Sequence, residues 1–445
     1  MIWGHNRALR RAVLNPVARF VTGSYITRDE CERAFARMHE RDRIGDTIHL
    51  VLGCLCMAMI SGPVSVAVFA PIPLVVFFLI RVLNTGPIWI HGFGQPVVIS
   101  GVLLAGWSAL SLIWSSDPRA GAESIAQLRW LALLGFVYPI IERRWALIAA
   151  LSLGFVFGFG AQVIDGFNGF GNPWLEEALW HEPERVSGWW DPAVGGSVLI
   201  AALGIHIPSA VGGKGRVRWI ALGACALTTI ALVATGTRGA WIAGVVMLVL
   251  ALGARVWSSK RIGIALLGVV VVGAGVSYLM VREGAGTRIE QAREQIERAR
   301  DGDLDSTIGA RISMGDHAFR SFLEHPIRGV GAGGFRGVME QTDSTLDDAA
   351  HAHNQVLQWM CELGIVGLAL GVLVVVCALV GAWRWARVDP WSYRAAPLWG
   401  MIGLVLVSAF DSVFVNLHTG ALMGAFVALS PVWSPSIDDR AKDDA

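Results

Sequence analysis

Long apolar runs separated by short polar segments dominate the pattern along this chain. Several runs come close to or exceed the ~20 apolar residues that a helix needs to cross a bilayer core. The clearest of them are 51–80, 97–114, 145–163, 219–233, 262–280 and 356–380. The pattern therefore predicts an all-α polytopic membrane protein.

A full segmentation predicts about twelve transmembrane helices, with one large loop between spans nine and ten. The predicted spans are 48–62, 66–83, 96–114, 125–140, 145–163, 191–208, 217–234, 238–255, 262–281, 355–382, 395–410 and 413–430.

The chain begins with a polar segment. Its stretch "RDECERAFARMHERDRIGD" has the charge pattern of an amphipathic helix and lacks the compact apolar region of a signal peptide. We therefore expect a cytoplasmic N-terminus. The predicted organisation is a cytoplasmic amphipathic segment at 1–46, membrane spans 1–9 at 47–281, a periplasmic loop at 282–352, spans 10–12 at 353–432 and a cytoplasmic tail at 433–445.

Basic residues orient these spans. If the N-terminus is inside, every short loop with a basic cluster also falls inside, as the positive-inside rule requires. These clusters are Arg143 and Arg144, then Lys214, Arg216 and Arg218, then Arg255, Lys260 and Arg261, then Arg384, Arg387 and Arg394. The large loop at 282–352 is then expected on the outer, periplasmic side.

Composition agrees with a membrane protein. Of 445 residues, 54% are hydrophobic and only 16% charged, which is too apolar for a water-soluble globule of this size. The net charge of +1 does not indicate a nucleic-acid partner. No CxxC pair occurs, so we expect the cysteines to be small hydrophobic residues, with neither disulfides nor a metal cage.

Arg238 lies between two apolar spans in "ALVATGTRGAWIAGVV". An arginine there costs ~2.5 kcal/mol or more unless it reaches the interface or has an anionic partner. Gly236 and Gly239 keep the turn thin enough for another group to approach. The arginine either marks a helix end or binds an anion. Because an outward arginine runs against the positive-inside bias, the anion site is favoured.

The loop contains a second candidate in "GARISMGDHAFRSFLEHPIRGVGAGGF", where Arg311 opens an amphipathic helix. The glycines after His325 permit positive φ and close backbone approach to a ligand. The pattern lacks the strand context of a nucleotide-binding fold.

Two histidines precede the tenth span. On a helix His351 and His353 would face apart, so only an extended segment places both on one side. Asn354 is expected to cap the helix, which leaves His353 at the outer membrane boundary as a neutral general base. The alternatives are a histidine without chemistry and a zinc site. Zinc needs a third ligand from His317, His325 or Asp316, whose spacing nothing fixes, so no metal is expected.

Glu362 lies nine residues after His353, or about 13 Å along a helix at about 1.5 Å per residue. Direct contact is therefore not expected. A buried structural pair is predicted instead, with Arg129 or the polar groups near Asp411. Small residues for close helix packing follow at Gly364, Gly367 and Gly371.

Taken together, "HAHNQVLQWMCELGIVGL" resembles the signature of the O-antigen ligase and polymerase superfamily. "TGTRGAW" is similar to that family's arginine turn, and "GARISMGDHAFRSFLEHPIRGVGAGGF" to its loop arginine with the His-Pro and Gly-Val-Gly segment. "RVSGWWDPAVGG" is similar to the start of an earlier span. The resemblance covers residues 185–371, whereas the first spans match only as generic membrane helices.

The resemblance implies a glycosyltransferase that moves a glycan from undecaprenyl diphosphate to an acceptor, without nucleotide sugar, metal or other cofactor. By position, His353 matches the catalytic histidine, and inversion at the anomeric carbon follows if it deprotonates the acceptor hydroxyl. Diphosphate is an anionic leaving group that guanidinium groups neutralise without losing a proton. The implied diphosphate-binding residues are Arg238, Arg311 and Arg185, and the supporting residues are His351, Asn354 and Glu362.

The expected partners are the lipid-linked glycan donor, a glycan or lipid A core acceptor, and membrane lipids, at the bacterial inner membrane with the site facing the periplasm. A ligase is favoured over an O-antigen or exopolysaccharide polymerase of the same superfamily. The loop bears more acids than bases, so the polymerase stays open. A polysaccharide transporter is a more distant alternative, because no internal repeat is visible.

Overall fold

The computed structural model describes residues 28–85, 87–167, 185–256, 294–295, 297, 307–342 and 351–430. These ranges are helical and contain no β-strand. The α-helices are α2 (Arg28–Arg41), α3 (Arg43–Met59), α4 (Val64–Phe69), α5 (Ile72–Thr85), α6 (Pro87–Phe93), α7 (Pro96–Ser111), α8 (Pro118–Gln127), α9 (Leu133–Val137), α10 (Arg144–Gly166), α12 (Pro192–Gly212), α13 (Gly215–Ala234), α14 (Arg238–Val256), α17 (Thr307–Glu324), α18 (Phe335–Thr342), α19 (Gln355–Ala386), α20 (Ala396–Val407) and α21 (Leu417–Ala428). Four 3-10 helices join them: η1 (Leu112–Trp114), η2 (Leu128–Ala132), η3 (Tyr138–Arg143) and η5 (Tyr393–Ala395).

Seven helical stretches in these ranges are long and apolar enough to cross a membrane: Val64–Val82, Pro96–Trp114, Pro118–Gly166, Pro192–Gly212, Gly215–Ala234, Arg238–Arg255 and Gln355–Ala386. Large apolar side chains point outward from them, with Val102 65% and Ile220 67% exposed. A water-soluble surface would not tolerate so many, but bilayer hydrocarbon does. The predicted class, an all-helical polytopic membrane protein, is confirmed in the described part of the chain.

The count of twelve spans and the placement of the large loop stay predictions. The ninth predicted span, 262–281, lies outside the described residues, as do most of 282–306 and the tail. The fourth, 125–140, is a series of short pieces made of the end of α8, η2, α9 and η3. Pro139 inside it cannot donate a helical hydrogen bond, which favours such a break.

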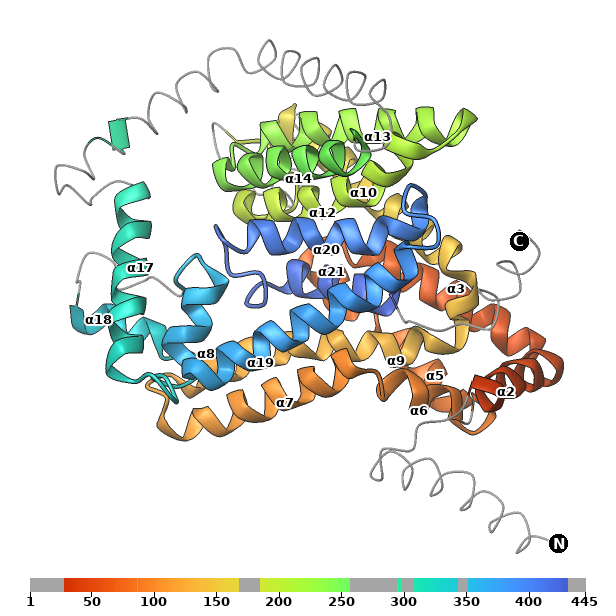
Figure 1. The fold of residues 1–445 in the computed structure, drawn as a ribbon, viewed down its shortest axis with the longest axis horizontal. Helices are drawn as coiled ribbons and strands as arrows, with labels where there is room; N and C mark the ends of the chain where they lie inside the picture. Colours follow the sequence, from red (N-terminus) through yellow and green to blue (C-terminus); the bar gives the residue numbers. More distant parts are fainter. Residues whose placement is uncertain are drawn as a thin grey trace, which may run out of the picture.

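Helix α12 forms the centre of the bundle, and 94% of the residues in its apolar stretch are buried. It packs against α13 and α14 on one side and against α20 and α21 on the other (Figure 1). A side chain at Gly204 would meet the backbone of Gly400 on α20, so small residues allow this close approach. Helix α19 runs beside α7 in the neighbouring layer.

The two ends of the bundle carry different elements (Figure 1). Helices α8, α17 and α18 lie at one end, and α2 lies at the opposite end. As predicted, α2 is amphipathic, and it buries Phe35 and Met38. His39 bridges Asp46 and Glu142, and these carboxylates raise its pKa to about 9, so it is protonated at neutral pH.

Candidate functional site

Helix α19 is interrupted at Gly364, whose φ of 65° and ψ of −163° lie in a region that only glycine adopts readily. The break frees carbonyl groups that a continuous helix would use. The Cys361 carbonyl accepts from the Val330 N–H at 2.9 Å, and the Glu362 carbonyl accepts from the Gly331 N–H at 2.8 Å. The glycine-rich turn therefore satisfies the backbone of α19 where no water is available.

The glycines of that turn let its backbone lie close to other segments of the chain. Gly329, Gly331 and Gly333 all have positive φ. A side chain at Gly329 would meet the α19 backbone at Glu362, and one at Gly331 would meet Ser115 at the end of η1. The turn that follows α17 therefore packs tightly against the break in α19 and against the end of η1.

Asn354 caps α19 as predicted, since its side chain accepts from the N–H groups of Val356 and Leu357. Its Nδ2 also donates to the Ala409 carbonyl at 3.1 Å. The next residue, Gln355, accepts the Phe414 N–H at 2.8 Å. These bonds hold the loop between α20 and α21 against the start of α19.

His353 adopts a left-handed conformation with φ of 47°, the one non-glycine residue of the described ranges to do so. A β- or α-region conformation costs less, so the surroundings impose this one. The result places the rings of His351 and His353 edge to face, with centroids 4.3 Å apart. Both imidazoles therefore lie on one side of the chain, although the left-handed conformation of His353 places them there and not the extended segment that the sequence analysis expected.

Sequence reasoning did not place Asp411 in the site. This buried carboxylate lies 4.0 Å from His353 (Oδ1 to Nδ1) and accepts the Ser412 N–H at 2.8 Å. Donor atoms of His351, His353 and Asp411 all lie within 4.8 Å of one another. Asp411 follows His353 by 58 positions (411 − 353), so no motif spacing could have found it.

Two histidines and a carboxylate are also a possible metal ligand set. Here the third ligand would be Asp411 and not His317, His325 or Asp316. The positive charge of Arg311 acts on all three groups, which disfavours a divalent cation and favours an anion beside them.

Burial sets the protonation states of the cluster. It lowers the pKa of His353 to about 3, and the neighbouring His351 and Arg311 lower it further. Burial also lowers the pKa of His351, although the carboxylate of Asp411 opposes this. His353 is therefore a neutral imidazole at physiological pH and can accept a proton.

Two arginines approach this cluster. Arg311, partly buried in the first turns of α17, interacts electrostatically with both Asp411 and Arg185. Arg185 donates from Nε to the Thr235 carbonyl at 2.8 Å and from Nη2 to the Thr237 hydroxyl at 3.1 Å. Two guanidinium groups held near each other repel, and a bound anion would relieve that repulsion.

Arg238 begins α14 in the same turn that anchors Arg185. Its Nη2 donates to the Gln295 side chain at 3.2 Å. As the sequence indicated, the turn at Gly236 is thin enough for another group to approach its backbone. The group that approaches is the side chain of Arg185, whose Cγ would lie 3.4 Å from a Cβ added at Gly236.

The predicted partners of Glu362 are wrong. Its carboxylate accepts the Phe335 N–H at 3.5 Å and also bonds the Gln358 side chain. Arg129 instead donates to the Ala126 carbonyl and stacks on Trp130. A carboxylate inside the protein can be stabilised by backbone N–H groups as well as by a cation, and residue spacing does not distinguish the two.

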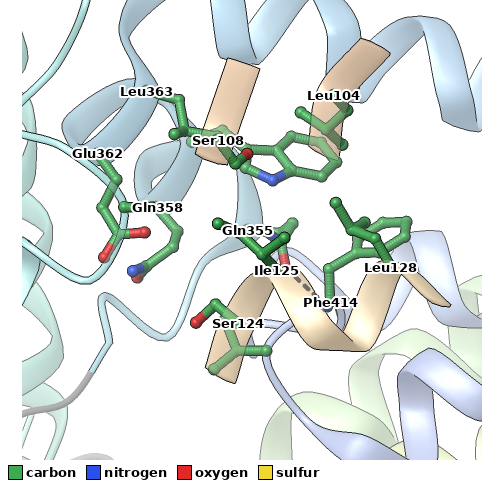
Figure 2. A pocket seen from close by; sticks show the side chains of 13 residues that line it. Leu104, Ser108, Ser124, Ile125, Leu128, Gln355, Gln358, Glu362, Leu363 and Phe414 are labelled. Atoms are coloured by element: carbon green, nitrogen blue, oxygen red, sulfur yellow. Dashed lines mark hydrogen bonds between the residues drawn. The ribbon is translucent and has the colours of Figure 1, made fainter. Parts of the chain in front are cut away.

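Beside the first turns of α19 lies a cavity of about 40 Å³, shown in Figure 2. Its polar lining consists of Gln355, Gln358, Glu362, Ser108 and Ser124. At about 10–15 Å³ of such space for each water molecule, the cavity can hold a few waters. Neither His351 nor His353 lines this cavity.

The fold and site define a helical membrane protein that gathers arginines, histidines and a carboxylate at one end of its bundle. Residues 223–372 match the family model described as O-antigen ligase. This match confirms the superfamily predicted from the motifs, and it spans Arg238, Arg311 and His353. No curated protein matches the chain.

Proposed function

We propose that the protein is an O-antigen ligase-like glycosyltransferase that moves a glycan from undecaprenyl diphosphate to an acceptor sugar, with lipid A core as the favoured acceptor. The observation that carries this proposal is the grouping of His353 with Asp411 at 4.0 Å, His351 edge to face with it, and Arg311 close enough to act on its charge. A base and an anion site are the two devices that this transfer needs.

In the proposed reaction, His353 takes the proton of the acceptor hydroxyl as that oxygen attacks the anomeric carbon. The bond from the anomeric carbon to the diphosphate oxygen breaks, and undecaprenyl diphosphate leaves with the bonding electrons. A single displacement of this kind inverts the configuration. The Asp411 carboxylate stabilises the imidazolium that forms.

The leaving group is assigned to the arginines. Arg311 and Arg185 lie near each other, and the negative charge of a diphosphate offsets their repulsion. Arg238, which begins α14 one residue after Thr237, is the third proposed contact. Guanidinium groups suit this role because they stay protonated and bind two oxygens at once.

The orientation of the bundle supports a periplasmic site. His353 precedes the N-terminal end of α19, whereas the basic residues Arg384 and Arg387 lie at its other end. If the positive-inside rule holds, that end is cytoplasmic and the site faces the periplasm of the inner membrane. The carrier lipid would present its diphosphate at this surface.

The decisive experiment is the surface-glycan ladder of a host that lacks this gene, complemented with the wild-type gene. Loss of all glycan-bearing lipopolysaccharide without the gene, with lipid-linked polymer accumulating, would support the ligase. A single repeat still attached to the core would support the polymerase alternative. An unchanged ladder with glycan retained inside the cell would support a transporter.

Changing Arg311 to lysine is expected to lower kcat/KM for the lipid-linked donor by about 10–100-fold, because lysine keeps the charge but not the two-pronged geometry. The measurement is transfer by purified protein at varied donor concentration. Arg320→Lys is the matched control, since Arg320 lies on the same helix, exposed, and pairs with Asp316. Equal rates for both variants would remove Arg311 from the donor site.

A further inference from the structure

Between the two histidines, the peptide of Ala352 is held by a side chain from α19. The Ala352 N–H donates to Gln358 Oε1 at 2.7 Å, and both groups are buried. Because Ala352 directly precedes His353, this bond fixes one side of the left-handed residue. The Asn354 cap fixes the other side.

Gln358 is itself held in place. It bonds the carboxylate of Glu362 one turn further along α19, and Figure 2 shows the two side chains lying next to each other. Glu362 in turn accepts N–H groups of Phe335 and Gly333. A continuous polar chain thus runs from the histidine loop to the glycine-rich turn.

That turn follows α17, the helix that carries Arg311. Apolar contacts reinforce the connection, because Met314 of α17 and Phe335 pack in one cluster with Ala352 and Cys361. The proposed base, His353, and the proposed diphosphate-binding residue, Arg311, therefore belong to segments that pack together as one unit. Gln358 lies where this unit meets the histidine loop.

We propose that Gln358 is a positioning residue for His353: by accepting the Ala352 N–H, it holds the imidazole in its partly buried place beside Asp411. The inference rests on the proposed function, since it assigns Gln358 a role in the same transfer. Gln358 does not touch the reacting atoms. Its effect acts through the conformation of the loop.

Removing this acceptor leaves the Ala352 N–H buried without its partner, so the loop should move until water satisfies that group. His353 would then leave its left-handed conformation and become more hydrated. The groups that face it are His351 on its own loop, Asp411 on the α20–α21 loop and Arg311 on α17.

The test is Gln358→Leu, which preserves the size of the side chain but not its acceptor. We expect kcat to fall about 10–100-fold with the donor KM nearly unchanged. In the pH profile of kcat/KM, the apparent pKa of the acid limb should rise toward about 6.5, the value of a hydrated histidine. The direction of this change follows from the role of His353 as a base, because only the neutral imidazole can accept a proton. Hydration raises the pKa of His353, so the variant loses activity at a higher pH than the wild type as the pH is lowered. A general loss of folded protein would not move that limb.

A matched rescue exchanges the two polar groups, Gln358→Glu together with Glu362→Gln. The carboxylate at position 358 accepts from Ala352 and from the new amide, whose oxygen accepts from Phe335, so the exchange should restore the rate. The acid limb should stay raised, because the carboxylate now close to His353 favours the imidazolium. Gln95→Leu is the control and should behave as wild type, because Gln95 precedes the N-terminal end of α7, whereas Ser108 near the other end lines the cavity with Gln358. Gln358→Asn, whose oxygen is drawn back from Ala352, should move the limb in the same direction if the leucine variant does not fold.

A wild-type rate and limb in both Gln358→Leu and Gln358→Asn would overturn the inference. Loss of activity without any movement of the limb, and without rescue by the exchange, would also overturn it, because Gln358 would then only support the fold. If His353→Ala is fully active the proposed function itself fails. If His353→Ala is inactive and both Gln358 variants are normal, only the inference fails.

Discussion

Replacing His353 by alanine is expected to slow glycan transfer by about 10²–10⁴-fold, the usual contribution of a general base. The physical reason is that His353 is the partly buried, neutral imidazole next to Asp411 and Arg311, while the acceptor hydroxyl is too weak an acid to ionise alone. The measurement is transfer from a lipid-diphosphate-linked glycan by protein purified in lipid nanodiscs. Folding is checked by thermal unfolding of the same sample.

His325→Ala is the matched control, because this exposed histidine follows α17 outside the cluster, and it should keep the wild-type rate. The pH dependence gives a second readout. With a free-enzyme pKa of about 3, His353 stays neutral through pH 5, so kcat/KM should not fall near 6.5. A bound diphosphate favours the imidazolium, so the acid limb of kcat should lie higher than that of kcat/KM. A full rate from His353→Ala would remove the proposed base.

Changing Gly364 to alanine is expected to destabilise the protein by about 3 kcal/mol or more and to abolish activity with it. The conformation at Gly364 is open essentially to glycine alone, and an added Cβ would collide with the Ile327 carbonyl. Any relief straightens α19 and breaks the bonds that the glycine-rich turn makes to Cys361 and Glu362. The measurement is the midpoint of thermal unfolding in detergent, together with the transfer rate.

Gly106→Ala is the control for this substitution. Gly106 lies within α7, exposed, and an added Cβ there meets nothing within 4 Å. Alanine at such a site should leave stability unchanged or raise it by about 0.5–1 kcal/mol. If Gly364→Ala unfolds at the same temperature as Gly106→Ala, the break in α19 is not required for the fold.

Much of the architecture followed from local pattern. Apolar runs predicted helices in a bilayer because buried backbone groups must pair within their own segment. Asn354 was recognised as a cap because its side chain satisfies amides only two and three residues away. The fourth span was the weakest prediction, since hydropathy reports burial but not whether a helix continues through Pro139.

The candidate residues were predicted unevenly. Arg185, Arg311 and His353 were selected by residue type and motif, and the structure brings them into one electrostatic neighbourhood. Asp411 was considered only as a neighbour of Glu362, and the structure assigns it to the histidines instead. Their roles in transfer stay predictions.

By itself, the sequence determined the membrane class, the superfamily and the residue types suited to an anionic donor and a proton acceptor. These properties depend on composition and on neighbours within a few positions. Only the tertiary structure decided that Asp411 lies beside His353, that Gln358 and not Arg129 bonds Glu362, and that the glycine-rich turn fills a break in α19. Such contacts join segments distant along the chain or depend on the conformation of a single glycine, and hydrogen-bond geometry at that range leaves no periodic trace in the sequence.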